Sequence, residues 1–192
     1  KNILNNIVQY MQIGSVWRAE RPQKGRYRQF SQCDIDVIGT SETIYIMNIF
    51  SAILDALSQI KIDDIKIIIN DRKIIDDILT QCSIPDDKKG SVLIIIDKMD
   101  KIGKEECMDL LSDIGISKEQ TAKLFDLIEN KNDTNKKLDI KNIANLIKSK
   151  YNADVEIDHK MVRGMNYYTG IIFEIKHNTL GLSIAGGGQY KN

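Results

Sequence analysis

The sequence predicts an α+β fold, in which an antiparallel β-sheet is interrupted by an α-helical insertion. Alternating patterns typical of β-strands fill residues 10–38 and return after residue 152, whereas the patterns in between become mostly helical. Glycine is concentrated in the second of these strand-like regions, because six of the twelve glycines lie in the last 29 residues. We therefore predict a core part at 1–70, a helical insertion at 71–151 and a second core part at 152–192.

The N-terminal region is predicted to form a hairpin of two long strands. Residues 10–20 and 26–38 are strand-like, and Pro22 and Gly25 mark the loop between them. Alternation puts three polar side chains on one face of the second strand and two charged ones on one face of the first. Such faces are too polar for a core, so they form either a solvated surface or the floor of a polar pocket. These residues are Gln32, Asp34 and Asp36 on the second strand, and Arg18 and Glu20 on the first.

The middle of the chain is predicted to be mostly helical. Ser117 and Gln120 have the spacing of a capping box at a helix start, and Gly115 ends the helix before it. The apolar run 92–96 fits either a strand or a buried helix, and its periodicity does not decide between them. The other expected elements are a helix at 42–59, a short buried strand at 66–70, a polar loop at 131–137, and strands at 153–158 and 169–176.

The composition excludes several classes of protein. Hydrophobic residues make up 42% and charged residues 28%, which is typical of a soluble globular chain. No apolar run approaches the roughly 18 residues that a membrane span needs. Three separated cysteines without a CxxC pattern, and only two histidines, argue against a disulfide framework and against a metal site. We therefore expect a reducing, cytoplasmic compartment and no structural metal.

Arginine is scarce, and its placement is informative. The chain has 21 lysines and six arginines, and four of the arginines fall within residues 18–28. A sequence that uses lysine so freely uses arginine where a planar fork of donors is needed, as in binding phosphate or carboxylate. The alternative is a chance cluster on a solvated hairpin. The six are Arg18, Arg21, Arg26, Arg28, Arg72 and Arg163.

Three segments carry a resemblance to a known family. The segment 15–39, SVWRAERPQKGRYRQFSQCDIDVIG, resembles motif 2 of class II aminoacyl-tRNA synthetases in its histidyl-tRNA synthetase form. The segment 162–175, VRGMNYYTGIIFEI, resembles the histidine-specific RGxxYY motif, and 183–190, SIAGGGQY, resembles the glycine-rich strand after it. The resemblance implies the class II antiparallel sheet and a histidine–tRNA ligase that uses ATP with Mg²⁺. It also implies tRNA(His) as a partner and a homodimeric full-length enzyme.

The resemblance also implies which residues bind ATP. Arg18 matches the arginine that binds the α-phosphate near the amino-acid carboxylate, and Glu20 matches the residue that approaches the adenine. Arg26 matches a loop arginine that reaches the β- and γ-phosphates. Arg163 matches an arginine that contacts the α-phosphate from the opposite side, where a cation offsets the charge that grows in the transition state. Arg18 and Arg163 are thus the expected catalytic residues.

The expected histidine pocket comes from the same resemblance. Gln32 and Asp36 match residues that hold the substrate histidine, and a carboxylate beside an imidazole orients its N–H. Tyr167 and Tyr168 match the pair that lines the pocket. The backbone around Gly187 is expected to approach the substrate closely, because glycine has no side chain.

Taken singly, these residues leave structural interpretations open. The tyrosine pair fits ordinary strand aromatics, Arg163 fits a surface arginine, and the run 186–188 fits a plain turn; their joint order and spacing favour the functional interpretation. Asp34 is interpreted as a structural hydrogen-bonding residue. His159 and His177 are interpreted as surface residues or satisfied strand residues.

The sequence departs from the family pattern at three positions and lacks some of its motifs. Asn166 replaces the usual aspartate of RGxDYY, and Gln189 and Lys191 replace an arginine and an aspartate. No motif 1, motif 3 or anticodon-binding domain is recognised, so we expect a central part of a catalytic domain. Two alternatives stay open: the histidine-sensing, synthetase-like regulatory subunit of ATP phosphoribosyltransferase, and the synthetase-like domain of a stress kinase. Sensor paralogues tend to lose the ATP-contacting residues of motif 2, which are present here.

Overall fold

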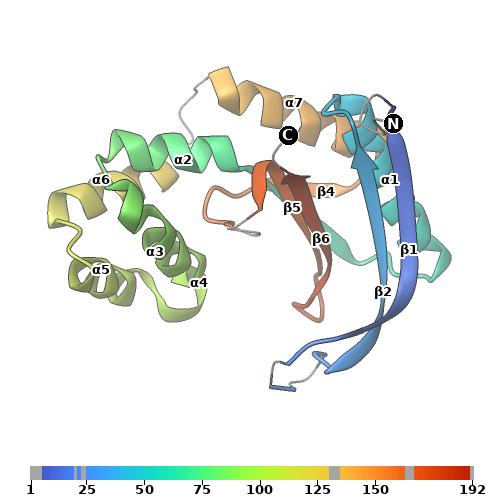
Figure 1. The fold of residues 1–192 in the computed structure, drawn as a ribbon, viewed down its shortest axis with the longest axis horizontal. Coiled ribbons are helices and arrows are strands. Elements are labelled where there is room, and N and C mark those ends of the chain that lie inside the picture. The colour runs from blue at the N-terminus through green and yellow to red at the C-terminus, as the bar shows by residue number, and fades with distance from the viewer. Residues whose placement is uncertain (1–5, 20, 23–24, 130–134, 163–166, 191–192) are drawn as a thin grey trace. The chain divides into compact units, whose positions relative to one another are not determined.

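The structure is a computed structural model that describes residues 6–19, 21–22, 25–129, 135–162 and 167–190 (Figure 1). The chain divides into two compact units, Lys1–Asp63 and Asp64–Asn192, and each of them contains one β-sheet. Every helix in the described part of the chain is too short or too polar to cross a membrane. The chain thus has the mixed α/β character that the sequence predicts.

The first unit contains a long antiparallel hairpin and one helix. Strand β1, Val8–Trp17, pairs with strand β2, Gln29–Ile38, in one unbroken register. After β2 the backbone turns at Gly39, where φ is +97° and an added Cβ would lie 2.9 Å from the carbonyl oxygen of Asn6, so glycine is required. Helix α1, Thr43–Gln59, follows. The predicted hairpin and helix are confirmed.

One face of the hairpin is apolar and exposed. Met11, Ile13 and Trp17 alternate along β1, and their exposed fractions are 63%, 68% and 71%. They share this face because side chains of a strand point to opposite sides in turn. Cys33, which pairs with Ile13 across the hairpin, is also exposed. Arg18, Gln32 and Asp36 have the opposite parity and therefore lie on the other face.

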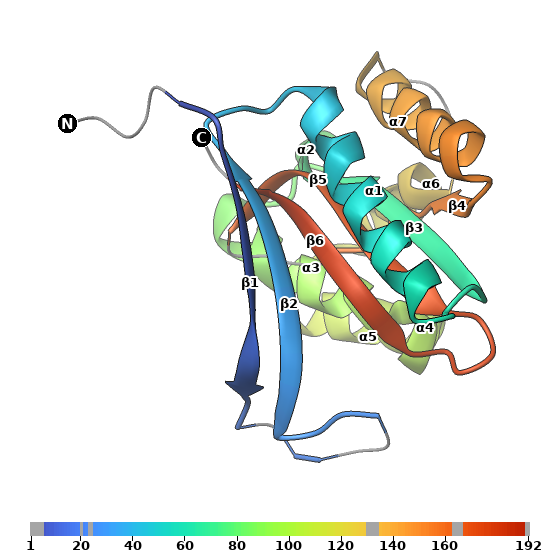
Figure 2. The ribbon, with the colours of Figure 1, turned by 90° about the vertical axis from the view of Figure 1, so that its right-hand side faces the viewer.

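The second unit is built on a four-stranded sheet with the order β4-β3-β5-β6 (Figure 2). Strand β3 runs parallel to β4 and antiparallel to β5, and β5 is antiparallel to β6. Ile67, Ile69, Ile172 and Ile175 are fully buried, so the two central strands carry the core. The strands are β3, Ile65–Asp71; β4, Asp154–Ile157; β5, Tyr168–His177; and β6, Ser183–Tyr190.

In the described part of the chain between β3 and β4, six helices follow one another. Helix α2 packs against β5, and α7 packs against β4 and β3, whereas α3 to α6 pack on one another, with α6 also touching α2. The predicted helical block 71–151 is therefore not a separate unit at its first and last helices, because these cover the sheet. The helices are α2, Arg72–Gln81; α3, Asp86–Asp97; α4, Met99–Ile102; α5, Lys104–Asp113; α6, Lys118–Glu129; and α7, Asn135–Tyr151.

The expectation of a single sheet is also wrong for the described residues. The strands that carry Gln32 and Asp36 form a two-stranded sheet of their own, and Tyr168 belongs to the four-stranded sheet. The physical reason lies in the backbone hydrogen bonds. Strand β2 pairs with β1, β6 pairs with β5, and no described strand forms backbone hydrogen bonds to both sheets.

The structure contains the helix start and the helix end that the sequence predicts in the helical block. Ser117 and Gln120 form the predicted capping box: Gln120 N donates to Ser117 Oγ at 3.1 Å, and Ser117 N donates to Gln120 Oε1 at 3.0 Å. Gly115 has a φ of +77° and follows α5, as expected of a helix end. The run 92–96 lies inside α3. Part of the expected loop 131–137 lies outside the described residues, and α7 begins at Asn135.

Candidate active site

The polar face of the hairpin is set by its register. Gln32 lies opposite Gly14, Asp34 opposite Gln12, and Asp36 opposite Tyr10, so these side chains project from one face of the two strands. Gly14 has no heavy atom within 4 Å of an added Cβ, which leaves open space opposite Gln32. The structure thus brings Gln32 and Asp36 to one face, as the alternation predicts.

Asp34 holds Gln32 in place on this face. Gln32 Nε2 donates to Asp34 Oδ1 at 2.6 Å, between side chains two residues apart on β2. This contact supports the interpretation of Asp34 as a structural residue. Because it uses one amide proton of Gln32, the other proton and the amide oxygen have defined directions. An oriented amide is suited to hydrogen bonding with a polar substrate.

Arg18 is positioned at the end of β1 on the same face. Its backbone N donates to the carbonyl oxygen of Arg28 at 2.8 Å, which extends the ladder past Trp17. Its guanidinium carbon lies 4.1 Å from the centre of the Phe30 ring, so the planar group stacks on an aromatic face. The guanidinium is planar, and stacking fixes the orientation of that plane, so its N–H donors are held in a direction that suits an oxyanion such as phosphate.

The other expected ATP residues are placed only in part. Arg26 lies in the loop of the hairpin and is exposed, which fits a side chain that meets a ligand from solvent. Glu20 lies outside the described residues, and so do Arg163 and Asn166.

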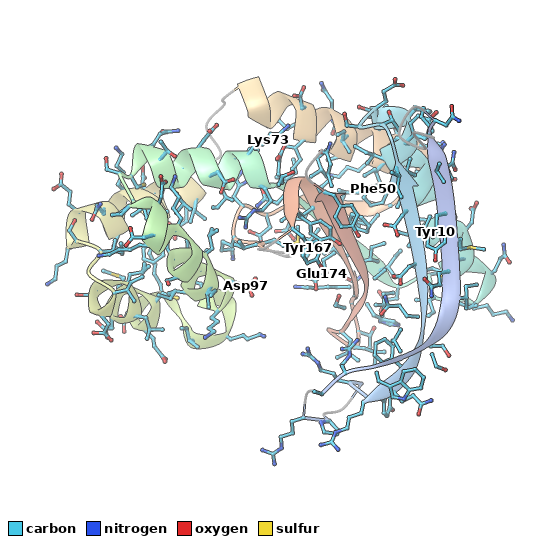
Figure 3. The ribbon with its side chains drawn as sticks, in the orientation of Figure 1. Tyr10, Phe50, Lys73, Asp97, Tyr167 and Glu174 are labelled. Carbon is cyan, nitrogen blue, oxygen red and sulfur yellow. The ribbon has the colours of Figure 1, made fainter. Side chains whose placement is uncertain are left out.

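Three tyrosines form a cluster in the second unit. The ring centres of Tyr167 and Tyr168 lie 4.3 Å apart, and the ring of Tyr190 lies 5.9 Å from Tyr167 and 5.4 Å from Tyr168. Tyr167 precedes β5, and its side chain is labelled in Figure 3. Tyr168 and Tyr190 are partners in the β5–β6 register. Sequence reasoning did not assign Tyr190 a role, and its place directly after the glycine run was the one signal that the sequence offered.

The glycines of β6 have a packing reason. A Cβ on Gly187 would lie 2.9 Å from Phe173 Cε1, and a Cβ on Gly188 would lie 2.7 Å from Cδ2 of the Tyr168 ring. Both contacts are closer than real side chains allow, so the rings of β5 occupy the space that a side chain would need. Gly187 is therefore required for packing against Phe173, and Gly188 for packing against Tyr168 of the expected pocket.

The two histidines have structural environments. His159 is buried, and its Nδ1 lies 3.0 Å from Asn70 Oδ1. His177 Nδ1 lies 3.5 Å from Asp64 Oδ2 near the β5–β6 turn. In the described part of the chain, no group of three or more His, Cys, Asp or Glu residues has the arrangement of a metal site.

A cavity of about 470 Å³ lies elsewhere in the second unit, between α7 and β4. It is lined by Lys148, Asp154 and Ile157 among others, and its wall includes the ion pair of Lys66 with Glu156, whose atoms lie 2.6 Å apart. None of the expected ATP or histidine residues lines it.

Comparison with known proteins decides the family. The profile described as histidyl-tRNA synthetase matches residues 4–192, which is nearly the whole chain. The chain belongs to the histidyl-tRNA synthetase family. This membership agrees with the order of the three segments noted in the sequence and with the strands on which they lie.

Relatives within the family match the chain along most of its length. The histidine–tRNA ligase of Leifsonia xyli subsp. xyli is 36% identical over 211 residues, which cover 97% of this chain and 48% of that protein. The crystal structure of histidyl-tRNA synthetase from Nostoc sp. PCC 7120 superposes with a TM-score of 0.74 at 28% identity, over 96% of this chain and 48% of that one. The chain thus spans about half the length of the curated relatives it matches.

A third likeness concerns the fold alone. A structure from Bacillus halodurans, described as an ATP phosphoribosyltransferase regulatory subunit/histidyl-tRNA synthetase, has a TM-score of 0.77 at 17% identity, over 96% of this chain and 52% of that one. Fold similarity at this identity does not distinguish a ligase from a regulatory subunit.

Proposed function

We propose that the protein containing this chain is a histidine–tRNA ligase, and that the hairpin of the first unit binds ATP. The observation that carries the proposal is the stacked guanidinium of Arg18, 4.1 Å from the Phe30 ring centre, on the same strand face as Gln32 and Asp36. A cation, an amide and a carboxylate spaced along one strand face suit a substrate with a phosphate at one end and an amino acid at the other.

The first step is activation of histidine. A carboxylate oxygen of histidine attacks the α-phosphorus of ATP, the bond to the β-phosphate oxygen breaks, and pyrophosphate leaves. Arg18 holds the α-phosphate, Arg26 reaches the β- and γ-phosphates with the accompanying Mg²⁺, and Glu20 contacts the adenine. Arg163 supplies the second cation at the phosphorus, where charge grows in the transition state. Arg18 and Arg163 are the catalytic residues of this proposal.

The histidine side chain is recognised by polar and aromatic groups. Asp36 accepts a hydrogen bond from one imidazole N–H, which fixes the tautomer, and Gln32 pairs with the polar end of the amino acid. Tyr167 and Tyr168, with the backbone at Gly187, line the pocket. Tyr190 extends the same aromatic cluster, with ring centres 5.4 and 5.9 Å from the other two.

The second step transfers the histidyl group to tRNA(His). A ribose hydroxyl of the terminal nucleotide attacks the carbonyl carbon of histidyl-adenylate, and AMP leaves. We further propose that the full-length protein is a cytoplasmic homodimer, and that 71–151 is an insertion into the catalytic core. The packing of α3 to α6 mainly on one another supports such an insertion.

The test is histidine-dependent exchange of pyrophosphate into ATP, followed by charging of tRNA(His), with the full-length protein. A ligase performs both reactions, and Arg18→Ala is expected to abolish exchange. The regulatory-subunit alternative predicts histidine binding with neither exchange nor charging. Retention of Arg18 and Arg26 favours the ligase, since a histidine sensor has no need of phosphate contacts.

A further inference from the structure

Asn70, near the end of β3, is a fully buried side chain with an exposed fraction of 0%. Its Oδ1 lies 3.0 Å from His159 Nδ1, and its Nδ2 donates to the carbonyl oxygens of Met161 at 2.9 Å and His159 at 3.4 Å. A single amide thus bonds one ring and two backbone carbonyls from a segment some ninety residues later in the chain.

The segment 158–162 is held partly by these contacts of Asn70. It follows β4 without entering a helix or strand, so its backbone groups need other partners. Asp158 N donates to Ile69 O at 3.2 Å, and Met161 N donates to Asp158 O at 3.2 Å. Met161 and Val162 at the C-terminal end of the segment are buried, so this end also packs against the rest of the unit. Asn70 supplies the long-range polar contacts to Met161 within this arrangement.

The chemistry of the contact requires an amide. The two carbonyl oxygens need a donor, and the ring nitrogen that faces Oδ1 needs an acceptor when it carries its proton. Asparagine offers both, so His159 bonds as the tautomer, or the cation, with a proton on Nδ1. Aspartate has the same shape but would present an oxygen to the carbonyls, and alanine would leave all three groups without this partner.

We propose that Asn70 is a positioning residue for the catalytic arginine, acting through the backbone of the segment 158–162. The clamp fixes Met161, which lies two positions before Arg163, and thereby sets where the chain enters the RGxxYY motif. The inference rests on the role proposed for Arg163. Misplacement of a catalytic group by about 1 Å costs roughly a hundredfold in rate, so a remote clamp of this kind has a measurable effect on turnover.

The test is a double-mutant cycle in the full-length protein, read by histidine-dependent pyrophosphate exchange. Asn70→Ala is expected to lower kcat about ten- to a hundredfold while the KM for ATP and for histidine changes less than about threefold. In an Arg163→Ala background the same change is expected to lower kcat less than about twofold, since a residue that acts through Arg163 has nothing left to position.

The outcomes separate the two claims. If Arg163→Ala lowers exchange and Asn70→Ala lowers it by the same factor in both backgrounds, Asn70 does not act through Arg163 and the inference fails while the role of Arg163 stands. If Arg163→Ala exchanges at the wild-type rate, the role proposed for Arg163 fails first, and the inference fails with it.

Two further variants separate positioning from folding. His159→Asn keeps a donor near the position of Nδ1 and is expected to retain most of the exchange rate, whereas His159→Phe removes the donor and is expected to behave like Asn70→Ala. Thr121→Val changes a buried polar residue in α6 and serves as the control, with an expected loss of thermal stability and an unchanged kcat. Equal exchange by His159→Asn, His159→Phe and wild type would overturn the inference even if Asn70→Ala fails to fold.

Discussion

At the scale of single residues, function depends on side chains whose direction is fixed by a neighbour. Arg18 stacks on Phe30, and Gln32 bonds to Asp34 on the same strand. Each pair turns a flexible polar group into an oriented one, and an oriented group gains more from a matching substrate because less conformational freedom is lost on binding. The proposed specificity for histidine is accordingly sensitive to single substitutions on this face.

Asp36→Ala in the full-length enzyme is expected to weaken histidine binding far more than ATP binding. The substitution leaves an imidazole N–H without its acceptor, which costs about 1–3 kcal/mol and corresponds to roughly ten- to a hundredfold in affinity. Calorimetric titration with histidine and with ATP measures both effects. A histidine affinity equal to that of the wild type would exclude Asp36 from the pocket.

Arg163→Lys is expected to lower histidine-dependent pyrophosphate exchange by about a hundredfold or more. Lysine keeps the charge but not the planar fork, so a preorganised transition-state contact is lost. Initial rates over a range of ATP concentrations provide the measurement. Wild-type exchange in this variant would identify Arg163 as an ordinary surface cation.

At the scale of elements, sequence patterns located most helices and strands, but they did not always show whether a segment is a helix or a strand. The hairpin and α1 were predictable because their periodicity is clear. The run 92–96 was not, since five consecutive apolar residues fit both periods. In the structure Val92, Leu93, Ile95 and Ile96 are buried while Ile94 is exposed. That arrangement suits a helix packed on several neighbours, and a strand would have placed Ile94 with Val92 and Ile96.

The capping box of α6 also links two helices. Besides its bonds to Ser117, Gln120 donates through Nε2 to Ser83 O at 2.9 Å and Cys82 O at 3.3 Å, just after α2. Ser117→Ala is expected to lower the free energy of unfolding by about 1 kcal/mol, the usual cost of a lost N-cap. Gln120→Ala loses the cap and the link, so its midpoint in urea is expected to be lower still. Equal midpoints for the two variants would show that the link contributes nothing.

Asp64, the residue before β3, ties that strand to the β5–β6 turn. Its carboxylate accepts from Thr179 N and Asn178 Nδ2, each at 3.0 Å. Hydrogen bonds from the Thr179 side chain and then from Asn178 hold the pKa of Asp64 below its ordinary value of 3.8. The stabilisation is therefore complete above pH 3.8 and is lost as the pH falls through the lower folded value.

Asp64→Asn is expected to lower the melting temperature at neutral pH, and the difference from wild type is expected to shrink as the pH falls below the ordinary value of 3.8 and through the lower folded pKa of Asp64. Thermal unfolding followed by circular dichroism over a pH series measures it. A difference that stays constant down to the acid limit would mean that the carboxylate charge has no part in holding the turn.

At the scale of the whole molecule, the pairing of distant strands was beyond prediction from one sequence. The tyrosine motif and the hairpin motif are each recognisable, but local alternation does not encode which strands pair across more than a hundred residues. Nor does it show that α2 and α7 cover the sheet, because their apolar faces look like those of the neighbouring helices. Tyr190 was missed for a similar reason, since its partners become visible only through the β5–β6 register.

The two units are expected to differ in their ability to fold alone. In the described part of Lys1–Asp63 the buried apolar side chains are Met47 and Phe50, whereas Asp64–Asn192 contains the buried strands β3 and β5 and the helical core. Apolar burial is the main source of stability, so residues 64–192 expressed alone are expected to melt cooperatively and residues 1–63 are not. Circular dichroism on both fragments is the measurement, and a gradual, non-cooperative melt of 64–192 would contradict the expectation.

The exposed face of the hairpin has a spectroscopic consequence. Trp17 is the only tryptophan of the chain, and Cys33 on the neighbouring strand is exposed, whereas burial raises the pKa of the Cys82 and Cys107 thiols and makes them poor nucleophiles at neutral pH. A thiol-reactive dye therefore labels Cys33 selectively.

Cys33 pairs with Ile13, four residues from Trp17, so donor and acceptor lie about 13 Å apart along the strands that carry Arg18 and Gln32 on their other face. Energy transfer between the indole and the dye follows the twist of this hairpin as ATP is titrated, and no amino-acid substitution is needed.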